Sequence, residues 1–141
     1  MVKFSDLEDA FIFTNFGEFS ENEALLNKKT GEIYYRSDFS DLDEFPEDWE
    51  SDDYIFLPNK YDLELGKSLV FDFVSEYIPD QLATVQYFFR RKGAYSRYKD
   101  LLDSLDLLEL WYEYESKKTK EALLQWCKEN DIEVELEDEN N

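Results

Sequence analysis

The apolar positions in the first part of the chain predict a helix. Four residues recur there at the spacing of one helix face: Leu7, Ala10, Phe11 and Thr14. Ser5 and Glu8 have the spacing of a capping box, in which two side chains satisfy the first backbone N–H groups of a helix. We therefore expect a helix over about residues 5–16 that ends near Gly17.

Three short apolar runs then predict a small antiparallel sheet. Residues 24–27 and 32–36 flank a turn that contains Gly31, which is typical of a β-hairpin. Residues 54–57 are β-branched and aromatic and predict a third strand. The stretch between them, residues 38–53, has no clear period and is interpreted as a loop.

The second half of the chain has helical spacing almost throughout. Helices are predicted over four stretches: about 63–77, 79–91, 95–105 and 106–129. Asn59 and Asp62 are spaced to cap the first of them, and Gly93 breaks the second. Ile132, Val134 and Leu136 alternate with glutamates, so residues 132–136 are expected to form an edge strand.

These elements predict an α+β fold. A leading helix and a small N-terminal antiparallel sheet of about three strands are followed by a helical C-terminal half of three to four helices. The 141 residues fit one domain, which we expect over residues 1–137, with a frayed tail at residues 138–141.

Composition excludes several chemistries. The chain has no histidine, so a Ser-His-Asp triad and imidazole metal ligands are absent. Cys127 is the one cysteine, so there is no intramolecular disulfide and no thiolate metal cage. No apolar run reaches membrane-spanning length and no signal peptide is evident, so we expect a soluble protein of the cytoplasm.

Charge is large and unevenly placed. The formal net charge is −20, which repels phosphate polymers and anionic membranes. Residues 38–53 hold nine acids and no base. Residues 86–99 hold no acid and one third of the 15 bases: Arg90, Arg91, Lys92, Arg97 and Lys99.

Four phrases of the sequence resemble one known family. They are Thr30-Gly31-Glu32-Ile33-Tyr34, Leu63-x-Leu65-Gly66, Gly93-Ala94-Tyr95-x-Arg97-Tyr98-Lys99-Asp100 and Leu110-Trp111-Tyr112-x-Tyr114. Over about residues 4–135 the chain is similar to a bacterial family of uncharacterised proteins. The resemblance implies a small, acidic, bacterial cytoplasmic protein, and it implies no activity, cofactor or catalytic residue.

The basic segment is the first candidate site. Arginine forks suit carboxylates and phosphates, and interleaved aromatic rings are typical of a platform that stacks unpaired bases. The candidate ligand- or partner-binding residues are Arg90, Arg91, Lys92, Arg97, Tyr98 and Lys99. A purely structural role is the alternative, in which Tyr98 lies in the core, Lys99 pairs with Asp103, and Arg97 bridges to the acidic half.

The acidic loop is the second candidate. Asp41 and Asp43 are spaced as at the start of a calcium loop, but Pro46 stands where that motif needs glycine and Asp52 where it needs glutamate. We therefore predict no metal site there. A solvated loop is favoured over an electronegative surface that competes with nucleic acid for a basic partner.

Catalysis is the least favoured hypothesis. An enzyme would need carboxylate pairs, such as Asp72 with Glu76 or Asp100 with Asp103, as acid, base or Mg²⁺ ligands. Asp72 is either exposed or paired with an arginine, Arg90 or Arg97. We predict no cofactor and a non-enzymatic binding or regulatory protein whose partner is another protein. Nucleic-acid or nucleotide binding through residues 86–99 is the alternative, disfavoured by net charge, and a Mg²⁺-dependent enzyme comes third.

Overall fold

The computed structural model describes residues 1–15, 21–38 and 40–136. It confirms the α+β class and contains two compact units. The first unit combines Met1–Leu63 with Ala122–Asn141, and the second is Glu64–Glu121. The single domain expected over residues 1–137 stays a prediction. The expected tail and Gly17 lie outside the described residues, but the first helix ends at Thr14, two residues before its predicted end.

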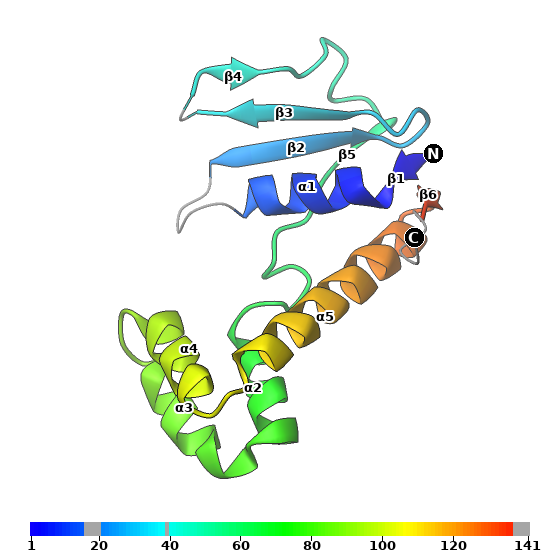
Figure 1. Cartoon of the computed structure of the whole chain (residues 1–141). Helices are drawn as coiled ribbons and strands as arrows, with labels where there is room; N and C mark the ends of the chain where they lie inside the picture. Colours follow the sequence, from blue (N-terminus) through cyan, green and yellow to red (C-terminus); the bar gives the residue numbers. More distant parts are fainter. Residues whose placement is uncertain (16–20, 39, 137–141) are drawn as a thin grey trace. The chain divides into compact units, whose positions relative to one another are not determined.

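An antiparallel sheet forms the centre of the first unit (Figure 1). Its strands, in the spatial order β4-β3-β2-β5, are β4 (Leu42–Asp43), β3 (Ile33–Ser37), β2 (Asn22–Asn27) and β5 (Tyr54–Phe56). Leu25 of β2 is opposite Tyr34 on one side and Phe56 on the other. The predicted hairpin and third strand are confirmed, whereas β4 lies inside the stretch that was interpreted as a loop.

Helix α1 (Phe4–Thr14) packs against this sheet through its apolar face. Leu7 and Ala10 are fully buried, and the Phe13 and Tyr35 rings meet edge to face at 4.9 Å. The predicted capping box is wrong. The N-cap residue is Lys3, so Ser5 lies within the first turn, because the chain enters α1 directly from a short strand.

That short strand is β1 (Val2–Lys3), which pairs in parallel with β6 (Val134–Glu135). The predicted terminal strand is therefore confirmed over two residues. Gly31, in the β2–β3 turn, has φ +79°, and a Cβ there would lie 2.8 Å from the backbone of Met1 and Val2. Only glycine combines this left-handed conformation with such a close approach.

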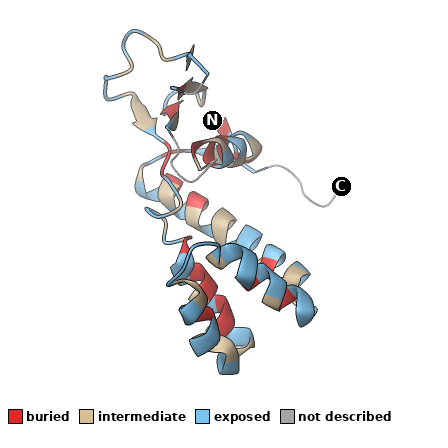
Figure 2. Ribbon diagram, turned by 90° about the vertical axis from the view of Figure 1, so that its left-hand side faces the viewer, coloured by how far each residue is buried: buried red, intermediate tan, exposed pale blue. Residues whose placement is uncertain are grey.

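The second unit is helical. It contains α2 (Lys67–Tyr77), the 3₁₀ turn η1 (Pro79–Gln81), α3 (Leu82–Phe88), α4 (Ala94–Ser104) and the first part of α5 (Leu108–Glu129). These helices bury one side each and expose the other (Figure 2). The buried residues form one core: Leu69, Val70, Phe73, Val74, Val85, Tyr98, Leu102 and Trp111.

The predicted start of α2 is wrong by about one turn. Asn59 and Asp62 do bond each other. The backbone N–H of Asp62 donates to the side-chain oxygen of Asn59 at 2.8 Å, and that of Asn59 donates to the Asp62 carboxylate at 3.1 Å. These bonds close a turn that is separate from the helix. Glu64 follows at φ +57°, which is incompatible with a right-handed helix. The helix therefore begins only after Gly66.

Candidate functional site

The basic segment occupies the end of α3, a tight turn and the start of α4. The backbone N–H groups of Arg90 and Arg91 donate to the carbonyls of Tyr87 and Phe88 at 3.1 and 3.2 Å. Gly93 then adopts φ +76° and ψ +20°, and nothing lies within 4 Å of the position that a Cβ would take. This left-handed glycine reverses the chain and lets α4 begin directly after the basic turn.

Five basic side chains are exposed around this turn, and we call them the basic surface: Arg90, Arg91, Lys92, Arg97 and Lys99. Among the described residues of the second unit, no carboxylate oxygen lies within 4.0 Å of any of them. The proposed pairing of Asp72 with Arg90 or Arg97 is therefore wrong, and so is the pairing of Lys99 with Asp103. The bridge from Arg97 to the acidic half stays a prediction.

Aromatic rings accompany two of these cations. The Arg91 guanidinium lies 5.0 Å from the centre of the Tyr87 ring, and the Lys99 ammonium lies 5.7 Å from that of Tyr112. Both tyrosines are nearly half exposed, at 47% and 45%. Exposed cation–π contacts contribute only about 0.5–1 kcal/mol, so they orient the charges without removing them from solvent.

Tyr98 does not belong to the basic surface, which corrects the sequence-based assignment. Its side chain is fully buried, with its ring edge to face with Trp111 at 5.1 Å. Successive helical residues are rotated by about 100°, so Arg97 and Lys99 project to the two sides of buried Tyr98. The interleaved sequence thus separates by face, with Phe89 and Tyr98 inward and the cations outward.

The core beneath this surface contains two unsatisfied donors. The Tyr98 hydroxyl and the Trp111 indole N–H are buried without a hydrogen-bond partner among the described residues. Burial, and secondarily the charge of Glu115, raises the pKa of Tyr98. Tyr98 therefore stays neutral at physiological pH, which suits a core position.

In the first unit the acidic loop is ordered by an arginine that the sequence analysis did not single out. The Arg36 guanidinium lies 4.2 Å from the centre of the Phe45 ring and 5.2 Å from that of Trp49. It also donates to the Glu23 carboxylate at 2.8 Å. Phe45 and Trp49 pack in turn on Phe56 of β5, at 5.9 and 6.0 Å. The loop is therefore held against the sheet and is not merely solvated.

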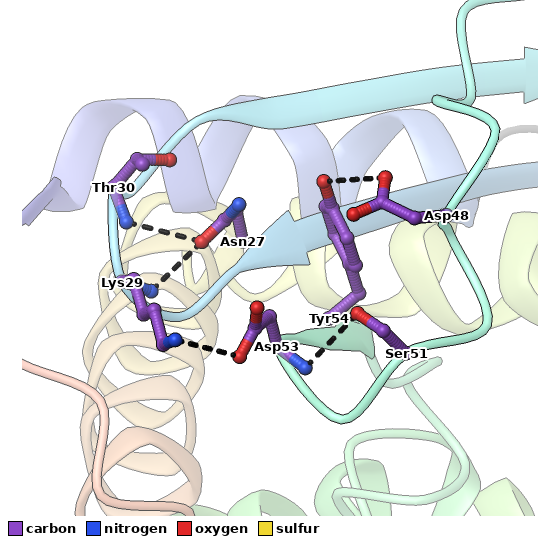
Figure 3. Close-up of polar contacts among 7 residues, drawn as sticks. All are labelled: Asn27, Lys29, Thr30, Asp48, Ser51, Asp53 and Tyr54. Carbon is purple, nitrogen blue, oxygen red and sulfur yellow. Dashed lines mark hydrogen bonds and ion pairs between the residues drawn. The ribbon is translucent and has the colours of Figure 1, made fainter.

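Polar contacts fix the same loop at its other end (Figure 3). Lys29, in the β2–β3 turn, pairs with Asp53 at 3.2 Å, and the Tyr54 hydroxyl donates to Asp48 at 3.3 Å. The Asn27 side chain accepts from the backbone N–H groups of Lys29 and Thr30 and closes the turn. These contacts use two of the nine carboxylates of residues 38–53.

The first unit also contains an open groove of about 490 Å³. It is lined by β1, the first turn of α1, the β2–β3 turn and β3, through Met1, Lys3, Asp6, Thr30, Gly31, Glu32, Ile33, Tyr34 and Tyr35. Within this lining the Tyr34 hydroxyl donates to Glu32, and this bond is the main cause that raises the pKa of Tyr34 to about 12. The sequence predicted residues 30–34 as part of a hairpin and of the family resemblance, but not as the lining of a groove.

The cysteine and the carboxylates of the described residues were candidates for catalysis or metal binding. Burial raises the pKa of the Cys127 thiol to about 11, so the reactive thiolate is scarce near neutral pH. Among the described residues, no three cysteine, aspartate or glutamate side chains are arranged to hold a metal ion. No helix in the described ranges is long and apolar enough to cross a bilayer.

Comparison with known proteins places the chain in a family and gives it no activity. No curated protein and no solved structure matches the sequence. One family model, described as an uncharacterised protein family, matches residues 1–141. That match includes the turn with Gly31, the basic surface and the aromatic core of the second unit. The chain therefore belongs to the uncharacterised protein family UPF0158.

Proposed function

We propose that this chain is a non-enzymatic binding protein of the bacterial cytoplasm, and that its basic surface docks an acidic protein partner. The observation behind the proposal is the set of five exposed cations with no carboxylate of their own unit in ion-pair reach. The second unit contains 11 acidic residues, so such pairs were available. Exposed cations without such pairs can attract an acidic partner over long range, and they can contact its carboxylates at the edge of an interface.

Aromatic side chains around the cations support an interface. Tyr87, Tyr95 and Tyr112 are each more than one-third exposed, although tyrosine rings bury well. Tyrosine and arginine are the residues most enriched at energetically important interface positions. A partner that covers these rings would desolvate the neighbouring guanidiniums and strengthen their bonds to carboxylates.

Nucleic-acid binding is the second candidate, favoured by the same exposed rings. Tyrosine faces stack on unpaired bases while arginines contact phosphates. The net charge of −20 opposes this reading, because a phosphate polymer is repelled before it reaches the local basic surface. Nucleic acid would therefore bind only at low salt and weaken steeply as salt rises.

The test is affinity capture with the triple variant Arg90→Ala/Arg91→Ala/Arg97→Ala beside the wild type. A matched control, Lys117→Ala/Lys118→Ala/Lys120→Ala, makes the same charge change elsewhere in the same unit. Captured protein and nucleic acid are both identified, and both variants are first shown to be folded by circular dichroism. The expected result is a defined protein that the arginine variant loses and the lysine variant keeps.

Direct binding then distinguishes the candidates. The captured protein is purified and titrated by calorimetry at two salt concentrations, in parallel with single-stranded RNA and DNA. A loss of about tenfold or more in affinity is expected for the arginine variant, because several charge-assisted bonds disappear together. Equal capture by both variants would contradict the proposal. Salt-sensitive RNA or DNA binding that only the arginine variant loses would replace it with the second candidate.

A further inference from the structure

We propose that the groove beside β3 binds an extended peptide with basic side chains, which adds to the edge of the sheet. This proposal rests on the first unit alone. It is independent of the basic surface and of any partner that binds there.

The edge of β3 is only partly occupied. In the order β4-β3-β2-β5, β4 pairs with β3 at Arg36 and Ser37 only. At Tyr35, the backbone carbonyl accepts from the Glu44 N–H at 2.9 Å, and the N–H donates to the Glu44 carboxylate at 3.1 Å. The Tyr35 backbone therefore faces outward, away from β2.

Ile33 faces the same way. Backbone groups of an antiparallel strand alternate in direction, so a residue two positions before Tyr35 also points to the outer edge. Glu32 confirms the alternation, since its carbonyl accepts from Asn27 of β2 at 2.9 Å. Among the described residues, the N–H and C=O of Ile33 have no hydrogen-bond partner. They are a free donor and acceptor on a strand edge, which is where added strands pair.

The groove gives this edge a second wall. Lys3 of β1 and Asp6 of α1 line it on one side, and Ile33 and Tyr35 of β3 line it on the other. Its volume of about 490 Å³ falls within the usual range of ligand clefts. Because Gly31 has no side chain, the turn stays close to β1 at this point. The lining thus offers backbone hydrogen bonds on one side and side-chain contacts on the other.

The charges around the groove select a basic occupant. Burial, followed by the charges of Asp9, Asp6 and Glu44, raises the pKa of Tyr35, so the field at its hydroxyl is negative. In the lining itself, Asp6 and Glu32 are the acidic side chains and Lys3 is the one basic side chain. An added strand with lysine or arginine on the α1 side would place its cations beside Asp6 and Asp9. An acidic peptide would meet repulsion.

Substitution at Ile33 isolates the strand-pairing step. Proline removes the outward N–H of Ile33 but leaves the bonds to β2 intact, because those come from the neighbouring residues. Ile33→Val is the matched control, since it keeps the N–H and the β-branched shape. Circular dichroism and tryptophan fluorescence are used to show that both variants retain the fold of the wild type.

The probe is a library of short random peptides displayed on phage, selected on the wild-type chain. We expect enrichment of extended sequences with alternating lysine or arginine. The selected peptides, fluorescently labelled, should bind Ile33→Pro about tenfold more weakly than wild type and Ile33→Val unchanged. Asp6→Asn should weaken binding by a smaller factor, and that loss should shrink at high salt.

Hydrogen exchange supplies an independent reading at one atom. The Ile33 amide should exchange quickly in the free protein and become protected when the peptide is bound. A protected Ile33 amide in the free protein would overturn the proposal, because the edge would already be occupied. Failure of any basic peptide to be enriched would overturn it as well. Equal binding to Ile33→Pro would show that strand addition is not the mode of binding.

Discussion

Arg36 and Arg91 show how the two units use the same side chain differently. Both guanidiniums lie over aromatic rings, but Arg36 is also bonded to Glu23 and is largely covered, with 26% of its side chain exposed. Arg91 is exposed over Tyr87, with no carboxylate of its unit in reach. The first arginine stabilises a loop, whereas the second remains available to a partner.

The charge of each unit makes this difference sharper. The first unit contains 24 acids and 6 bases, whereas the second contains 11 acids and 9 bases. Arg36 is the only arginine of the acidic unit, and it is used within the fold. The nearly balanced unit leaves its three arginines exposed at one turn. The unit with the excess of acidic residues thus pairs its arginine internally, whereas the nearly balanced unit leaves its arginines without a carboxylate of that unit in reach.

The largest expected effect comes from the two left-handed glycines, one in each unit. Gly31→Ala should cost about 2–5 kcal/mol of unfolding free energy, because the new Cβ adds a backbone clash to the conformational strain. Gly93→Ala should cost only about 1–2 kcal/mol, because nothing lies within 4 Å of its Cβ position. Urea unfolding of both variants measures the difference. Equal losses would mean that β1 does not approach the turn in solution.

Arg36→Ala should have the next largest effect, a loss of about 1–3 kcal/mol. It removes contacts with two rings and leaves the Glu23 carboxylate without its partner. Trp49 fluorescence should also shift to longer wavelength as the loop leaves the sheet. Arg91→Ala is the matched control in the other unit, and its stability should change by less than about 0.5 kcal/mol. A similar loss of unfolding free energy in both variants would mean that the two arginines do not differ in their structural role.

Tyr98→Phe should change stability by less than about 1 kcal/mol, with stabilisation the expected sign. The hydroxyl is buried without a partner, so its removal relieves a desolvation cost while the ring contacts stay. Partner capture should be unchanged, because Tyr98 is not on the basic surface. Thermal unfolding measures the first effect. A clear destabilisation would indicate a hydrogen bond that the fold forms in solution.

The smallest expected effect is a change in the pKa of one tyrosine, Tyr34. Tyr34 has a pKa of about 12 because its hydroxyl donates to Glu32, whereas the pKa of Tyr98 is raised mainly by burial. Because the pKa of Tyr34 is higher in the folded than in the unfolded protein, its protonated hydroxyl stabilises the fold at pH values below about 10, the pKa of an unfolded tyrosine. This stabilisation is lost as the pH rises through 12. Glu32→Gln should lower the pKa of Tyr34 and leave that of Tyr98 unchanged, as NMR of the tyrosine ring carbons would show.

Local periodicity predicted most elements of the fold, because it appears in runs of four or more residues. The β2–β3 hairpin and all four C-terminal helices have such runs. The strands β1 and β4 each have two residues and, unlike the equally short β6, were not predicted from a longer alternating run. Ser5 matched a capping motif but lies within the helix, since its role depends on where β1 ends and not on its own spacing.

The candidate sites differ in the same respect. The basic surface was found by counting charge, because its members lie within ten residues of the chain. Helical spacing alone did not show whether the Tyr98 side chain lies in the core or on the surface. Its packing against Trp111 places it in the core. Neither the contacts of Arg36 with Glu23, Phe45 and Trp49 nor the groove has a local signal in the sequence. Both join residues from separate segments that the sheet brings together.

The pairing of β1 with β6 has a consequence for the order in which the chain folds. The whole second unit lies between these two strands in the sequence, so its core residues are all available before Val134 is synthesised. The helical unit can therefore form its core through contacts between neighbours in the sequence, without any residue that follows it. The sheet unit has its own hairpin early but must wait for the returning strand, and until then the edge of β1 stays unpaired.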